Sequence, residues 1–179
     1  LEAHEGLCAL VWCGFAFTLV FAPISSLFPI MTLDHFGGST TEAATAEIVF
    51  SIGMIAGSAL LATIGGRMNP IRMMTGSLVV FGVAVLVSGL LNEGAFTIFL
   101  IMSFLMGLSS PFYSGPQVAL LQERIEPEYL GRVFGLYGTI MAWALPVGLV
   151  APTLLADSFG APTWFVGAGA LMLLLAAGR

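Results

Sequence analysis

The sequence predicts an all-α membrane protein that crosses the bilayer six times. Of the 179 residues, 58% are hydrophobic and only 8% are charged, whereas a soluble domain carries about 25% charged residues. Long apolar stretches match the roughly 20 residues that a helix needs to cross a bilayer. All five basic residues are arginines, and a six-span threading places every one of them on the same side.

The predicted spans form one six-helix bundle. They cover 7–31, 43–65, 73–91, 95–121, 133–156 and 162–178. Helices are favoured over a barrel because a helix satisfies its own backbone in lipid, and no ten-residue alternation typical of barrel strands is present.

The short connections predict the orientation of the bundle. Segments 66–72 and 122–132 hold most of the arginines, whereas 32–42, 92–94 and 157–161 lie on the opposite side. Short cytoplasmic loops retain Lys and Arg, so the arginine side and the C-terminus are expected in the cytoplasm. Nucleic acid is excluded as a partner because phosphate binding needs clustered basic residues; the lipid bilayer is the expected surrounding.

The spans differ in polarity. Polar and small residues recur at helical spacing on one face of 43–65 and of 95–121, and polar residues also occur in 7–31 and 133–156. The spans 73–91 and 162–178 are nearly all aliphatic or small, so we expect these two to face lipid on most sides. Two partly polar spans followed by one aliphatic span, repeated twice, is the pattern of three-plus-three inverted repeats in secondary transporters.

Glycine supplies a separate packing signal. The chain has 22 glycines, and in a membrane bundle small residues allow helix backbones to approach closely. Gly53 and Gly57 are four residues apart and predict such a contact.

Two segments carry a resemblance to a known family. Residues 122–135 (QERIEPEYLGRVFG) are similar to a Q-x-x-x-P-x-x-x-x-G-R-V-x-G junction, and 32–44 (TLDHFGGSTTEAA) resembles an outer loop of the same family. In the turn 65–72, Arg67 and Arg72 fit the basic positions of a G-x-x-x-D-R-x-G-R-R loop, but Gly66 stands at the aspartate position. The chain thus resembles the C-terminal half of a major facilitator superfamily transporter, in the bacterial branch that exports drugs, macrolides and siderophores.

The resemblance implies half of a major facilitator fold in a bacterial plasma (inner) membrane. It implies efflux of small amphipathic or drug-like molecules by alternating access, coupled to inward proton flow. The partner would be an N-terminal six-helix half, or a second copy of the chain. Because the chain begins at Leu1 and lacks the basic start of a signal peptide, we expect a piece of a longer protein.

The candidate substrate-binding residues are polar, aromatic or methionine side chains on the partly polar spans. They are Trp12, Phe15, Thr18, Ser51, Met54, Ser103, Ser110, Tyr113, Ser114, Gln117 and Trp143. Aromatic and methionine side chains, here also Met102 and Phe112, suit adaptable apolar pockets. The alternative is ordinary core packing for the large residues and helix–helix packing for the serines.

Glu47 is the candidate proton-coupling acid. It is the only carboxylate well inside a predicted span, and an ionised carboxylate in hydrocarbon is costly, so it should face a cavity or an interface. The alternatives are a partner for a cationic substrate, or an acid favoured by the dipole of a helix N-terminus.

Arg67, Arg72, Arg124 and Arg132 are assigned to topology or gating. A latch that opens on the cytoplasmic side is one interpretation, favoured by the resemblance for Arg132. Surface pairing worth under about 1 kcal/mol is the other.

The sequence predicts no enzyme, no cofactor and no metal site. His4 and His35 lie outside the spans, and no HExxH, GxSxG or phosphate loop is present. Cys8 and Cys13 are five residues apart on different helix faces and are expected to be buried thiols. Two further interpretations stay open: a self-contained six-helix protein that homodimerises as a small pore or exporter, and a non-transporting membrane scaffold.

Overall fold

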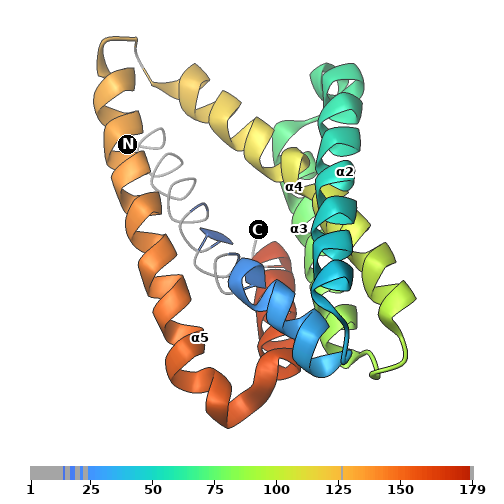
Figure 1. Cartoon of the computed structure of the whole chain (residues 1–179). Coiled ribbons are helices and arrows are strands. Elements are labelled where there is room, and N and C mark those ends of the chain that lie inside the picture. The colour runs from blue at the N-terminus through green and yellow to red at the C-terminus, as the bar shows by residue number, and fades with distance from the viewer. Residues whose placement is uncertain (1–13, 15–16, 19–20, 22–23, 126, 178–179) are drawn as a thin grey trace.

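Every element of the described residues is helical. The computed structural model describes residues 14, 17–18, 21, 24–125 and 127–177. After helical residues 24–30, the elements are η1 (Met31–His35, a π-helix), α2 (Thr40–Ile64), η2 (Gly65–Arg67), α3 (Pro70–Leu90), α4 (Phe96–Arg124) and α5 (Pro127–Ala177) (Figure 1).

Four stretches of the described residues are long and apolar enough to cross a membrane. They are Thr40–Arg67, Pro70–Leu90, Phe96–Glu123 and Gly160–Ala177. The all-helical, membrane-spanning class agrees with the sequence. Six crossings arranged as two repeats stays a prediction, and much of 7–31 lies outside the described residues.

Local capping moves two helix starts toward the N-terminus from the predicted positions. The Glu42 amide donates to Ser39 Oγ at 3.4 Å, and Glu42 Oε2 accepts from the Ser39 amide at 2.7 Å, which is a capping box. The α2 helix therefore begins at Thr40. Asn69 Oδ1 accepts from the Ile71 amide at 2.9 Å, and Pro70 occupies the first turn, so α3 begins at Pro70.

Two predicted connections, one before α5 and one within it, are shorter in the structure than the sequence predicted. The expected loop 122–132 is largely helical, because α4 continues to Arg124 and α5 begins at Pro127. The expected loop 157–161 is a kink within α5, where Gly160 adopts φ 72° and ψ 156°. A left-handed φ is readily adopted only by glycine, so the chain turns there without a longer loop.

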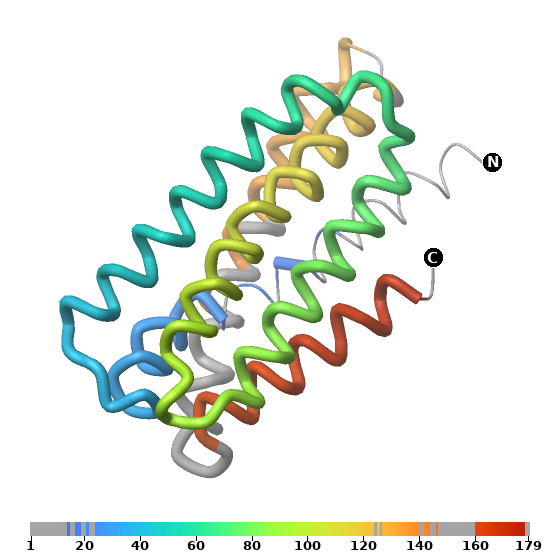
Figure 2. Tube along the Cα trace, turned by 90° about the vertical axis from the view of Figure 1, so that its right-hand side faces the viewer, coloured from blue at the N-terminus to red at the C-terminus, as the bar shows by residue number. Residues whose placement is uncertain are grey.

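The helices are arranged around α4 and α3. The α4 helix packs against α2 and α3, and α3 also packs against α5 (Figure 2). The first part of α5 runs apart from α2, α3 and α4 (Figure 1, orange). The α2–α3 and α4–α5 junctions lie at one end of the bundle, and the 91–95 connection lies at the other.

Glycines form the contact between α2 and α4. A Cβ on Gly53 would collide with the carbonyl of Phe104, and a Cβ on Gly57 with that of Leu108. On the other side of the contact, a Cβ on Gly107 would collide with the carbonyl of Phe50. The close approach predicted at Gly53 and Gly57 is confirmed.

A second glycine contact joins α3 to the last part of α5, and it corrects one expectation. A Cβ on Gly169 would lie 2.6 Å from the Leu86 amide nitrogen, and one on Gly89 would lie 2.7 Å from the Pro162 carbonyl. In α3, 56% of the apolar window is buried, against 11% in α2. The prediction that 73–91 faces lipid on most sides is wrong, because its small residues place it between α4 and α5.

Gly107→Ala should destabilise the protein, because its methyl group meets the α2 backbone rather than a movable side chain. Overpacking costs about 1–3 kcal/mol, which outweighs the gain of up to about 1 kcal/mol from Ala in a helix. The matched control is Gly76→Ala on α3, where an added Cβ meets nothing within 4 Å. Thermal unfolding in detergent should show a lower midpoint for the first variant alone; equal midpoints would contradict the close contact.

Candidate functional site

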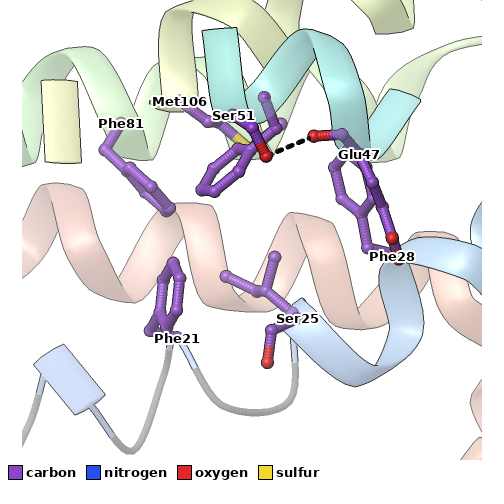
Figure 3. A pocket seen from close by; sticks show the side chains of 9 residues that line it. Phe21, Ser25, Phe28, Glu47, Ser51, Phe81 and Met106 are labelled. Carbon is purple, nitrogen blue, oxygen red and sulfur yellow. Dashed lines mark hydrogen bonds between the residues drawn. The ribbon is translucent and has the colours of Figure 1, made fainter. Parts of the chain in front are cut away.

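A cavity of about 260 Å³ lies between Phe21, residues 24–28, α2, α3 and α4. Figure 3 shows its side chains, with Glu47 and Ser51 on α2 and with Phe21, Ser25 and Phe28 on the N-terminal segment. The lining residues are Phe21, Ile24, Ser25, Phe28, Glu47, Phe50, Ser51, Phe81 and Met106.

Aromatic contacts support the walls of this cavity. The ring centroids of Phe28 and Phe50 are 6.2 Å apart, and those of Phe21 and Phe81 are 5.9 Å apart. Phe28 also lies 5.1 Å from Phe99, which is fully buried. Centroid separations of this size are typical of favourable aromatic pairs, so one side of the cavity belongs to the hydrophobic core.

The polar edge of the cavity, formed by Glu47 and Ser51, consists of hydrogen-bond acceptors. Ser51 Oγ donates its proton to the Glu47 carbonyl at 2.9 Å (Figure 3). A hydroxyl has only one proton to donate, so towards a ligand Ser51 can only accept, and an ionised carboxylate also only accepts. Acceptors next to aromatic faces suit a ligand with a cationic or N–H donor group on an apolar body.

A second polar cluster joins the N-terminal segment to α4 and α5. The amide of Gln117 lies where a Cβ on Gly14 would be, and the Tyr137 hydroxyl is 3.3 Å from the same point. Gln117 is only 3% exposed. Glycine at position 14 thus leaves room for the buried amide of Gln117.

The predicted substrate-binding residues do not converge on one cavity. Of that set, Ser51 lines the cavity beside Glu47, whereas Met54 is exposed one turn further along α2. Tyr113 is buried and stacks on Phe17 at 4.2 Å. Trp143 is 68% exposed on the first part of α5.

Four hydroxyl groups of the predicted set, those of Thr18, Ser51, Ser103 and Ser114, bond to carbonyls within their own helices. Ser103 Oγ donates to the Phe99 carbonyl at 2.7 Å and Ser114 Oγ to the Ser110 carbonyl at 3.3 Å. Thr18 Oγ1 donates to the Gly14 carbonyl at 2.9 Å. Ser103 is fully buried, and Ser110 is half-buried.

Several predictions concern residues outside the described part of the chain. These are His4, Cys8, Trp12, Cys13, Phe15 and Arg179, together with the side chain of Arg124. The arginines Arg67, Arg72 and Arg132 are exposed. They belong to the α2–α3 junction, the start of α3 and the start of α5.

The cavity contains aromatic residues that sequence reasoning did not select. Phe21 and Phe28 are seven residues apart with Ser25 between them, which places all three on one helical face. Phe50 lies between Glu47 and Ser51 on α2 and shares their face. This periodicity was a usable signal, whereas Phe81 and Met106 reach the cavity only through tertiary packing.

The chain is similar to macrolide efflux proteins and to an MFS-type transporter. It is 43% identical over 176 residues to macrolide efflux protein A of Streptococcus pyogenes, covering 98% of this chain and 44% of that protein. It is 45% identical over 149 residues to macrolide efflux protein A of Enterococcus faecalis, covering 83% of this chain and 46% of that protein. An uncharacterised MFS-type transporter, YfiS of Bacillus subtilis, is 29% identical over 130 residues, covering 67% of this chain and 30% of that protein.

The chain therefore spans less than half the length of the curated relatives it matches. The sequence profile of the Major Facilitator Superfamily matches residues 10–178. This superfamily consists of transporters rather than enzymes, which agrees with the prediction of no enzymatic activity. On this match across nearly its whole length, the chain belongs to the major facilitator superfamily.

Proposed function

We propose that this chain is one half of a proton-coupled transporter that exports small amphipathic or drug-like molecules by alternating access. The observation that carries the proposal is 43% identity to a macrolide efflux protein over 98% of the chain. In such transporters the substrate lies near the middle of the membrane, between two six-helix halves. A bacterial plasma membrane is the proposed location.

The exposed surface of α5 supports a partner half. Added Cβ atoms on Gly131, Gly135 and Gly138 meet nothing within 4 Å, and Leu136 and Trp143 are 63% and 68% exposed. Small residues in membrane helices favour close approach of another helix. An N-terminal six-helix half would cover this surface, and a second copy of the chain is the alternative occupant.

The cavity at Glu47 is proposed as part of the substrate site. Its volume of about 260 Å³ falls just below the roughly 300–1,000 Å³ of sites for drug-sized ligands. A ligand held here would extend towards the partner half. The acceptors on α2 favour substrates that carry a positive charge on an apolar body.

Glu47 is proposed as the proton-coupling acid. Its exposed position at the edge of the cavity allows both water and ligand to reach the carboxylate, and protonation would remove the only acidic charge in the lining. The arginine-bearing end of the bundle is proposed to be cytoplasmic, with Arg132 at a contact that opens when the transporter faces inward.

Glu47→Gln should strongly reduce proton-driven export while leaving the fold intact. A contact with a charged group is worth about 1.5–3 kcal/mol, which corresponds to roughly a tenfold to a hundredfold change. Uptake of a radiolabelled macrolide into inverted vesicles, which corresponds to export from the cell, should fall by about that factor under an imposed pH gradient. The control is Glu93→Gln, an exposed acid in the α3–α4 connection. Unchanged pH-driven export by Glu47→Gln would remove this residue from the mechanism.

Replacing Phe28 and Phe50 with Leu should weaken binding of cationic substrates and spare uncharged ones. The change retains apolar volume but removes ring faces worth about 0.5–2 kcal/mol each to a cation. Because two rings are lost together, equilibrium binding of a cationic macrolide should weaken by about fivefold to several hundredfold. Phe134→Leu on α5, which is outside the cavity lining, is the control. An equal loss for charged and neutral ligands would contradict a cation-binding role.

Cysteine labelling should place both arginine-bearing junctions on one side of the membrane. In a background with Cys8 and Cys13 replaced by Ser, Arg67→Cys and Arg124→Cys should react with an impermeant maleimide only from the cytoplasmic side. Asn92→Cys, in the connection at the opposite end, should react only from outside. Labelling of positions 67 and 124 from opposite sides would overturn the orientation.

A further inference from the structure

A groove between α3 and α4 opens on the surface of the helix bundle and is separate from the proposed transport site. It has a volume of about 260 Å³ and lies near the α2–α3 junction, away from Glu47. Met73 and Val80 of α3 and Leu108 and Phe112 of α4 form apolar walls, and Arg72 lies at the junction end.

The polar groups of the groove, apart from Arg72, are already satisfied as donors. Ser77 Oγ donates to the Met74 carbonyl at 2.8 Å, and Ser109 Oγ donates to the Met106 carbonyl at 3.1 Å. The groove therefore presents an apolar channel with a single cationic group at one end. That pattern fits an amphipathic anion.

Gly76 keeps the groove open. It lies in the interior of α3, where glycine is less stable than alanine, yet an added Cβ would meet nothing within 4 Å. At the glycines between α2 and α4, an added Cβ would collide with a neighbouring backbone. At Gly76, no described helix lies close enough to exclude a larger residue. The space beside it is available to a molecule outside this chain.

Arg72 has no oppositely charged partner within the described residues. It is exposed in the first turn of α3, and that turn contains no acidic residue. Among the described residues, no carboxylate forms an ion pair with Arg72. A cation in the first turn of a helix is disfavoured by the helix dipole, so an anion bound there interacts favourably with both the guanidinium and the helix end.

We propose that this groove binds one anionic phospholipid, with the phosphate at Arg72 and an acyl chain along the channel to Val80. Basic pockets between membrane helices on the cytoplasmic side are suited to anionic headgroups. A free phosphate would use Arg72 alone, whereas the lipid also uses the apolar walls. The proposal requires a membrane-embedded chain but does not depend on what the protein transports.

The test is native mass spectrometry of the complete protein encoded by the reading frame, titrated in detergent with phosphatidylglycerol or with phosphatidylcholine of identical chains. One phosphatidylglycerol should bind at least about fivefold more tightly than phosphatidylcholine. Arg72→Gln should remove this preference, and Arg72→Lys should retain most of it. Gly76→Leu, which fills the channel, should weaken the binding of both lipids by about fivefold or more.

Two matched controls separate a site from a general effect. Arg67→Gln removes an equal charge from the same junction but does not line the groove, and Val79→Phe adds bulk to α3 beside the groove. Both should bind phosphatidylglycerol within about twofold of the unaltered protein.

Equal losses in Arg67→Gln and Arg72→Gln would indicate general attraction to a basic end and overturn the site. Equal binding of the two lipids, or normal binding by Gly76→Leu with an unchanged melting temperature, would overturn it as well. Inorganic phosphate that displaces phosphatidylglycerol completely would assign the anion to free phosphate instead.

Discussion

Close backbone contact at glycines is the constraint on which the arrangement of these helices depends. Lipid is as apolar as the side chains it surrounds, so burial from water contributes little to helix association in a membrane. Van der Waals contact between backbones must supply much of the attraction. Gly53, Gly57 and Gly107 provide that contact between α2 and α4, and Gly89 and Gly169 provide it between α3 and α5.

The α2–α4 contact also decides where the chemistry of α2 can act. Because the glycine face of α2 is turned to α4, the face that carries Glu47 and Ser51 remains exposed. The same contact brings Phe50 close to Phe28 and the core around Phe99. An acidic side chain is thereby held at the edge of an aromatic wall, where it lines the cavity instead of being buried in the core.

Composition and periodicity predicted the helical membrane class and one close helix contact, because these depend on local sequence. Glu47 and Ser51 could be assigned to one helical face for the same reason, and both line the cavity. The remaining cavity residues could not be selected in this way. Phe81 and Met106 lie on different helices, and their meeting depends on how α3 packs against α4 and α5.

The burial of α3 was mispredicted because an aliphatic, glycine-rich helix has the same composition whether its neighbour is lipid or another helix.

The position of Glu47 bears on how export and proton entry would be linked. A single carboxylate balances one positive charge, so a proton and a cationic substrate would exclude each other at this side chain. Ser51 Oγ already donates its proton to the Glu47 backbone carbonyl. It therefore cannot donate a hydrogen bond to the Glu47 carboxylate in place of the transported proton. Release of substrate outside would then free Glu47 to take up a proton, and loss of that proton inside would restore the acceptor for the next substrate. Competition at one acid would thus be enough to couple the two movements, provided that the exposed face of α2 lines the path between this chain and its partner half.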